Sequence, residues 1–307
     1  MGKREYGMCE IISKIRIELD STGGAAMGFE LLRAKAGVHV YRCLYNGQTA
    51  VVKFFEKEGD RREIRNYRLL MKLGVPVMEI FALGERCIIM EDIGASELWR
   101  LGEEADMADP RVLRELARWY FALHEAGRKA EQLDDMWSEN DELKEETIAS
   151  IRERLPGSEK LCDYVQGRLD WLRALIRMRE DTLTYNDFYY TNFLVRRDKS
   201  AAMMFDYNYM GRGYRYADFR NVQSSVSEEA FAAFLNEYSA MHRAKYGTEY
   251  EISEMDRRLD SFLSPFLGLA NALGRERFPA WAEQARKDAL SGTLLKRGEE
   301  IFEDAQR

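Results

Sequence analysis

The first third of the chain alternates short hydrophobic runs with glycine and polar turns, a pattern typical of β-strands. A strong hairpin signal, Asn46-Gly47, stands directly before one of these runs. Between two later runs, residues 61–71 carry hydrophobic side chains at helical spacing instead. Strands are expected at 31–36, 38–44, 50–55, 75–83 and 86–90. The pattern predicts a five-stranded antiparallel sheet that carries one helix.

Beyond residue 93 the hydrophobic spacing is mainly helical, with one exception. Two short apolar runs, 192–195 and 201–205, flank a polar turn and predict a strand hairpin. Helices are expected at 110–127, 158–179, 228–244, 251–272, 279–289 and 293–305. Residues 1–24 fit either a helix or a strand, and the pattern does not decide between them.

This division predicts an α+β protein with two lobes. Residues 1–93 would form a small lobe with an antiparallel sheet and one helix, and residues 94–307 a larger, mainly helical lobe. A chain of 307 residues with 46% hydrophobic content is long enough to build two cores. No run approaches eighteen apolar residues, so no membrane span is expected.

Charge and cysteine usage narrow the class of protein further. A net charge of -7 disfavours nucleic acid as a partner, because nucleic acid calls for a basic face. The first six residues lack the apolar stretch of a secretion signal. The four cysteines are scattered and form no Cys-x-x-Cys motif, as in a reduced, cytoplasmic protein.

One stretch, residues 131–146, is strongly acidic, with eight carboxylates against the single Lys144. Such a patch beside a substrate cleft would attract a cationic acceptor molecule. It is equally typical of a solvated surface that keeps a protein in solution. The sequence leaves both interpretations open, as it leaves open the oligomeric state.

The chemistry concentrates in three residues, Asp187, Asn192 and Asp206. The expected hairpin would return Asp206 to the neighbourhood of Asn192, and Asp187 lies in the loop before its first strand. Two carboxylates and one amide supply the oxygen donors that magnesium prefers. Phosphoryl transfer requires positioning and charge neutralisation more than covalent chemistry. The alternative is that Asp and Asn simply favour turns here.

A lysine in an apolar strand, Lys53, strengthens the first interpretation. A buried ammonium group is costly unless an opposite charge meets it. Glu63, on the predicted helix that follows, is the natural counter-ion. The alternatives are a lysine that extends to water from an edge strand and a glutamate on a solvated helix face.

Taken in order, these elements resemble a known family. A lysine strand, a glutamate helix, the connector Met-Glu-Asp-Ile-Gly at 90–94, an Asp-x4-Asn loop and a later Asp are similar to the protein-kinase-like fold. The closest resemblance is to the aminoglycoside phosphotransferase and choline kinase branch, whose Leu-His-x-x-Gly motif matches residues 123–127. The resemblance covers residues 28–245 and implies a two-lobe kinase.

The resemblance also implies roles for the nucleotide-binding residues. Lys53 would contact the α- and β-phosphates of ATP, and Glu63 would hold Lys53 in place. The backbone groups of Glu91 and Ile93 would meet the adenine edge, and the turn at Gly37 would lie by the phosphates.

For the reaction itself, the resemblance implies that Asp187 orients or deprotonates the acceptor hydroxyl. Asn192 and Asp206 would ligate Mg2+. Asp218 would brace the catalytic loop in a structural role.

The sequence departs from the family pattern at three places. Tyr185 replaces the histidine that commonly precedes the catalytic Asp. The run at 205–208 is Phe-Asp-Tyr-Asn and not Asp-Phe-Gly, which argues against a regulated protein kinase. The turn at 35–39 has one glycine where the family pattern has three. The sequence therefore does not indicate how this turn would cover the phosphates of the nucleotide.

The sequence therefore predicts an ATP-dependent kinase that phosphorylates a hydroxyl of an aminoglycoside or a similar amino-alcohol or sugar. The alternatives are a metabolic kinase for choline, homoserine or a sugar, and a kinase-like binding protein without turnover. Retention of all five residues of the expected site argues against the last alternative. The expected partner is a small molecule, with neither nucleic acid nor membrane involved.

Overall fold

The computed structural model describes residues 3–305 and divides into two compact units. Unit 1 contains residues 1–126, 187–210 and 221–249, and unit 2 contains residues 127–186, 211–220 and 250–307. The boundary expected after residue 93 stays a prediction.

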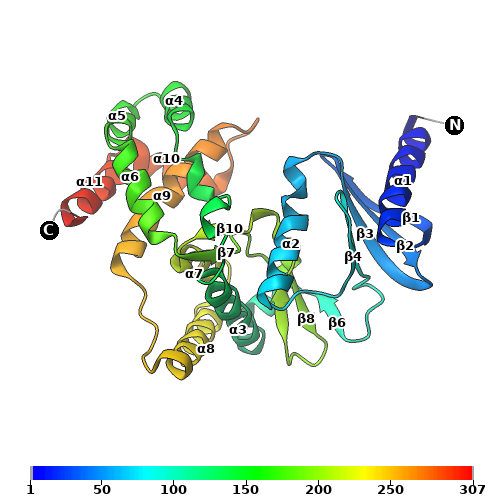
Figure 1. Ribbon diagram of the computed structural model, residues 1–307. Helices are drawn as coiled ribbons and strands as arrows, with labels where there is room; N and C mark the ends of the chain where they lie inside the picture. Colours follow the sequence, from blue (N-terminus) through cyan, green and yellow to red (C-terminus); the bar gives the residue numbers. More distant parts are fainter. Residues whose placement is uncertain (1–2, 306–307) are drawn as a thin grey trace. The chain divides into compact units, whose positions relative to one another are not determined.

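Unit 1 begins with the five-stranded antiparallel sheet that the sequence predicts (Figure 1). Its strands are β1 (Ala26–Lys35), β2 (Val38–Tyr45), β3 (Gln48–Phe55), β4 (Ile80–Leu83) and β5 (Cys87–Glu91), in the order β1-β2-β3-β5-β4. The strand expected from residue 75 begins only at Ile80. Pro76 has no N–H for a strand ladder, and its carbonyl oxygen accepts a hydrogen bond from Trp119 Nε1 at 2.8 Å instead.

Two helices cover opposite faces of this sheet (Figure 1). Helix α1 (Lys3–Thr22) settles the open question about the first residues. It buries Ile11, Ile15 and Leu19, spaced four apart, in one core cluster with side chains of β2, β3 and β5. Helix α2 (Arg62–Leu73) lies against the other face and ends at Gly74, whose backbone is left-handed.

The remainder of unit 1 holds the predicted hairpin. Strands β8 (Phe193–Arg196) and β9 (Ala202–Met204) pair antiparallel, and β6 (Trp99–Leu101) adds a third strand beside β8. The backbone N–H of Phe205 donates to the Asn192 carbonyl oxygen at 2.9 Å, which closes the hairpin next to Asp206. Helices α3 (Pro110–Gly127) and α8 (Glu228–Tyr246) complete this region.

Unit 2 is mainly helical and contains one short strand pair, β7 (Thr182–Thr184) with β10 (Gly211–Gly213). Its helices are α4 (Glu145–Arg154), α5 (Glu159–Gly167), α6 (Leu169–Arg179), α9 (Glu254–Leu273), α10 (Glu283–Leu290) and α11 (Thr293–Ala305), and α7 (Arg215–Gln223) starts here and ends in unit 1. The single helix expected at 158–179 is two helices. The break falls at Arg168, whose guanidinium stacks over the rings of Tyr164 and Phe302. No helix within residues 3–305 is long and apolar enough to cross a bilayer.

Candidate functional site

A cavity of about 650 Å³ in unit 1 brings the predicted chemistry together. Its lining comes from the sheet face that carries Lys53, from α2, and from the segments on either side of the β8–β9 hairpin. Five of the predicted site residues line it: Lys53, Glu63, Asp187, Asn192 and Asp206. They are drawn from three separate stretches of the sequence, so the cavity exists only in the folded unit.

One ammonium group at this cavity faces two carboxylates. Lys53 Nζ lies 2.6 Å from Glu63 Oε2 and 3.0 Å from Asp206 Oδ1. The Glu63 side chain is 1% exposed and that of Lys53 is 12% exposed, whereas Asp206 is 33% exposed and reaches the cavity. The pair predicted from sequence is therefore present, and Asp206 joins it.

The pKa values in this cluster reflect its burial and its charge. Burial raises the pKa of the Glu63 carboxyl to about 7, against the opposing attraction of Lys53. Burial also acts to lower the pKa of Lys53, but the attraction of Glu63 and Asp206 outweighs it and the pKa is raised. The two shifts have different origins, burial for Glu63 and two neighbouring carboxylates for Lys53. With one cation between two carboxylates, the cluster favours additional positive charge.

Asp187 and Asn192 form a second contact in the same cavity. The Asn192 side-chain nitrogen donates to Asp187 Oδ2 at 2.8 Å and to the Asp187 carbonyl oxygen at 3.0 Å. The pKa of Asp187 is raised by burial and by the nearby negative charge of Asp206, and the hydrogen bond from Asn192 opposes this only in part. Asp187 is thus a better proton acceptor than an ordinary surface carboxylate.

The turn that carries Asp206 is clamped by α2. Asp206 has a left-handed backbone with φ of 60°, which costs free energy in a residue other than glycine and needs surrounding support. The buried Asn66 side chain donates to the carbonyl oxygens of Tyr207 and Met210, at 2.7 and 3.2 Å. Arg62 Nε donates to the Asn208 carbonyl oxygen at 2.8 Å. These contacts hold both ends of the turn.

Three predicted residues do not line the cavity, namely Gly37, Glu91 and Ile93. Gly37 forms the β1–β2 turn with φ of 94°, and its neighbours Ala36 and Val38 line the cavity in its place. Glu91 ends β5 opposite Ala50, and Ile93 follows in the connector; the cavity reaches β5 only at Met90.

Asp218, predicted to brace the catalytic loop, lies in unit 2 and contacts that loop. Its carboxylate accepts hydrogen bonds from the backbone N–H groups of Tyr185 and Asn186, at 2.9 Å in each case. Tyr185, which stands where the family has histidine, is fully buried.

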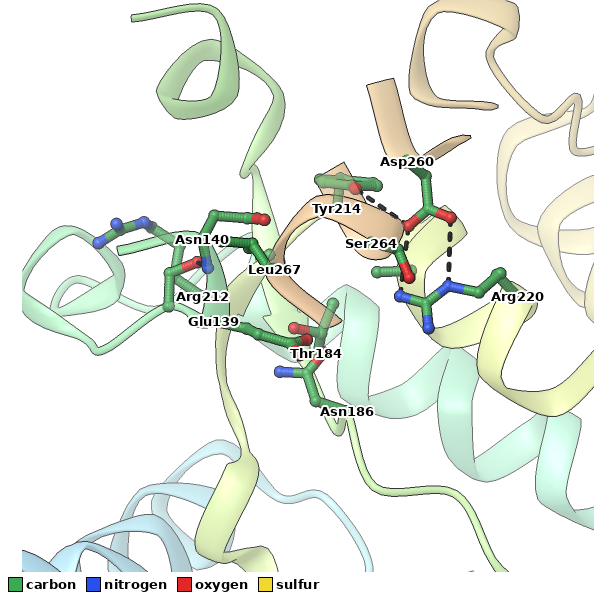
Figure 2. A pocket seen from close by; sticks show the side chains of 13 residues that line it. Glu139, Asn140, Thr184, Asn186, Arg212, Tyr214, Arg220, Asp260, Ser264 and Leu267 are labelled. Carbon is green, nitrogen blue, oxygen red and sulfur yellow. Dashed lines mark hydrogen bonds and ion pairs between the residues drawn. The ribbon is translucent and has the colours of Figure 1, made fainter. Parts of the chain in front are cut away.

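A second, much smaller cavity of about 20 Å³ lies in unit 2, room for about one water molecule. Figure 2 shows its polar lining, in which the Asp260 carboxylate accepts hydrogen bonds from Arg220 and the Tyr214 hydroxyl. Glu139 and Asn186 also line it.

Beside this cavity, Arg212 is 6% exposed and its Nε donates to Glu180 Oε2 at 2.7 Å. The other oxygen of Glu180 accepts hydrogen bonds from Ser138 and Asn140. Arg212 Nη2 also donates to Asp141, at 3.0 Å. Both carboxylate oxygens of Glu180 and all three guanidinium nitrogens of Arg212 thus have partners, with Nη1 donating to the carbonyl oxygens of Asp134 and Met136.

The acidic stretch at 131–146 is thus partly neutralised within unit 2. Asp134 pairs with Arg177 at 2.9 Å, Asp141 pairs with Arg212, and Glu142 pairs with Lys144 at 2.8 Å. Glu145 and Glu146 occupy the first turn of α4, where negative charge favours the helix dipole. Two acidic side chains of this stretch line cavities: Glu139 lines the small one, and Glu145 lines another of about 600 Å³ beside Trp171 and Phe302.

The sequence interpretation missed several residues of these sites. Arg33 and Lys35 line the larger cavity, and their alternation just before the β1–β2 turn was a detectable signal. Asn66 lies three residues after Glu63 on the same face of α2, which also marks it. The partners of Arg212 come from distant parts of the chain and left no sequence signal.

Comparisons with known proteins bear on the family and the fold. The phosphotransferase enzyme family matches residues 29–252. Macrolide 2'-phosphotransferase from Brachybacterium faecium has a similar structure, with 18% identity, a TM-score of 0.55 and coverage of 90% of this chain and 97% of that one. Choline kinase from Cryptosporidium parvum gives 13% identity, a TM-score of 0.58 and coverage of 97% of each chain.

Spectinomycin phosphotransferase, solved in complex with ADP and spectinomycin, gives 11% identity, a TM-score of 0.54 and coverage of 95% and 98%. At these identities the three structures show the shared fold. No curated protein sequence matches the chain. Because the family match spans most of the sequence, the protein belongs to the phosphotransferase enzyme family, which confirms the predicted kinase-like fold and the enzyme class, a phosphotransferase with an alcohol group as acceptor.

Proposed function

We propose that this protein is an ATP-dependent small-molecule kinase that uses the cavity of unit 1. The observation that carries the proposal is the convergence of Lys53, Glu63 and Asp206 with Asp187 and Asn192 around one space of about 650 Å³. A volume of this size suits a nucleotide or a molecule of similar size.

The donor set fits magnesium. Across residues 3–305 no three His, Cys, Asp or Glu side chains form a metal-holding group, so the proposed set is Asn192 and Asp206, an amide and a carboxylate. Oxygen-only ligands are those that Mg2+ prefers, completed by phosphate oxygens and water. Burial and then the negative charge of Asp206 raise the pKa of the nearby Asp187, and a cation would offset the second of these causes. When bound, the ion would neutralise charge on the transferred phosphoryl group.

On the nucleotide side, Lys53 would donate to the α- and β-phosphates. Glu63 holds the ammonium group at 2.6 Å and fixes its direction. The backbone groups of Glu91 and Ile93 would meet the adenine edge, and the turn at Gly37 would lie over the phosphates.

On the acceptor side, Asp187 would receive the hydroxyl proton. The acceptor oxygen then forms a bond to the γ-phosphorus, the bond from that phosphorus to the β-phosphate oxygen breaks, and ADP leaves. Asn192 holds the Asp187 carboxylate through its side-chain nitrogen, which fixes the carboxylate's orientation.

The acceptor would be a hydroxyl-bearing small molecule, an aminoglycoside or a similar amino-alcohol or sugar. A preference for cationic acceptors would rest on the acidic stretch at 131–146, in which Asp134 and Asp141 are ion-paired within unit 2. Asp135→Asn should then raise KM for a cationic acceptor and leave KM for a neutral sugar unchanged.

A screen of ATP consumption over amines, sugars and aminoglycosides tests the proposal, with Asp187→Asn as the matched inactive control. Turnover with one acceptor and its loss in the variant are the expected result. A protein that neither turns over nor gains thermal stability with ATP and Mg2+ would instead be a kinase-like binding protein.

A further inference from the structure

Two cations share the sheet face of Lys53. Arg33 of β1 pairs with Val40 of β2, and Val40 pairs with Lys53 of β3. Residues directly opposite one another in an antiparallel sheet point to the same face. Arg33 and Lys53 therefore stand on one face, two strand spacings or about 10 Å apart.

Lys35 lies on the same face of the sheet, two residues beyond Arg33 in β1. It pairs with Val38, which pairs with Phe55, two residues beyond Lys53 in β3. Arg33, Lys35, Val38 and Val40 all line the cavity of unit 1, which confirms their common direction.

These two cations differ from Lys53 in the charges that surround them. Neither Arg33 nor Lys35 forms an ion pair or a hydrogen bond through its side chain with any residue in the part of the chain that the structure describes. Lys53, in contrast, is compensated by Glu63 and Asp206. The uncompensated positive charge at this cavity lies on β1.

The strand pairing also gives approximate distances between rows of residues along the cavity. Glu91, where the adenine edge is expected, pairs with Ala50, three residues before Lys53 in β3. At about 3.3 Å per residue, the Lys53 row lies about 10 Å from the Glu91 row, and the Lys35 row about 7 Å further. A nucleotide that starts at Glu91 would pass Lys53 and Arg33 and end near Lys35.

We propose that Arg33 and Lys35 form a phosphate clamp, in which Arg33 binds at the level of the β-phosphate and Lys35 binds the terminal phosphate. This inference rests on the proposed function. It accounts for the β1–β2 turn, which has a single glycine at 37. Charged side chains from the strand before the turn supply the donors that a longer glycine-rich loop would supply from its backbone.

Calorimetric titration with Mg-ATP, Mg-ADP and AMP tests the clamp in Arg33→Gln and Lys35→Gln. We expect Lys35→Gln to weaken Mg-ATP binding about tenfold, as for one lost charge-assisted hydrogen bond, with little effect on Mg-ADP. Arg33→Gln should weaken Mg-ATP and Mg-ADP alike. AMP binding should be unchanged in both variants.

The matched control carries the same loss of charge on α2, in Arg65→Gln and Lys72→Gln. Both side chains are exposed and lie outside the cavity, so nucleotide binding should be unchanged. If the wild type binds Mg-ATP and both β1 variants bind it equally well, the clamp is overturned and the proposed function is not. Equal losses for ATP and AMP would overturn it too, and a wild-type protein that binds none of the three would overturn the proposed function with it.

Discussion

Two buried ionic clusters, one in each unit, each pair one cation with two carboxylates and differ in the size of the cavity beside them. In the lysine cluster of unit 1, Lys53 faces both Glu63 and Asp206 beside a large cavity. In the arginine cluster of unit 2, Glu180 accepts hydrogen bonds from Arg212, Ser138 and Asn140.

The difference separates a ligand site from a structural support. Fully satisfied buried networks rigidify a fold, and removing one partner leaves a costly unpaired charge. A cluster with an excess of one charge beside an open cavity has shifted pKa values and favours a ligand of the opposite charge. We therefore assign chemistry to the lysine cluster and its neighbour Asp187, and stability to the arginine cluster.

The largest expected effect tests the assignment of chemistry to the lysine cluster and Asp187. Asp187→Asn should cut turnover by about 10²- to 10⁴-fold and leave nucleotide affinity nearly intact, because it removes a positioned base. Asp206→Asn should also weaken the metal-dependent binding of ATP. Steady-state kinetics and calorimetry measure the two effects, and identical behaviour of both variants in both assays would contradict the assignment.

Glu180→Gln tests the assignment of stability to the arginine cluster. Loss of the carboxylate charge leaves the buried Arg212 with only the half-exposed Asp141 as an ion-pair partner, so the free energy of unfolding should fall by as much as about 3–5 kcal/mol. Urea denaturation measures this. The kcat of the folded fraction should be unchanged. A variant with normal stability and abolished turnover would break the comparison.

A smaller effect is expected at Asn66, which connects the lysine cluster to the turn after β9. Asn66→Leu leaves the carbonyl oxygens of Tyr207 and Met210 without their donor, which should cost about 1–3 kcal/mol of stability. If Asn66 also positions Asp206, the Mg2+ concentration for half-maximal activity should rise. Arg62→Ala removes a different contact of the same turn, the hydrogen bond to the Asn208 carbonyl oxygen. It is the control for a general loosening of the turn that does not involve Asn66.

The effect that is smallest at any single pH step is a dependence of stability on pH. The pKa of Glu63 is raised in the folded protein from its model-peptide value of 4.5 to about 7. The folded state thus binds more protons than the unfolded state in this range, and stability should decrease as pH rises from 4.5 to 7, by at most about 1.4 kcal/mol per pH unit. Denaturation curves of the wild type and Glu63→Gln between pH 5 and 7.5 should differ in slope, and parallel curves would contradict the shift.

The sequence predicted well what depends on local pattern. The sheet, α2 and α3 follow from hydrophobic spacing and turn residues, and the spacing of Asp187, Asn192 and Asp206 led to their cavity. Lys53 stood out because a charged group in an apolar strand requires a partner.

What the sequence could not predict depends on tertiary contacts. The first helix was ambiguous because Ile15 fits either period, and packing of Ile11, Ile15 and Leu19 on the sheet decided it. The acidic stretch could not be interpreted because Arg177 and Arg212 lie far from it in sequence. The break at Arg168 followed from aromatic stacking with Phe302, more than a hundred residues later.

The discontinuity of unit 1 has a consequence for synthesis of the protein on the ribosome. Asn66 and its acceptor Tyr207 are 141 residues apart, and Lys53 and Asp206 are 153 apart. At about 5–20 residues per second, the amino-terminal part of unit 1 leaves the ribosome roughly ten seconds before the segment that completes its ionic cluster. During that interval Glu63 and Lys53 have only each other, and the nascent sheet exposes the surface that the later segment covers. We expect chaperones to bind this nascent intermediate, and the proposed site to assemble only after Asp206 has left the ribosome.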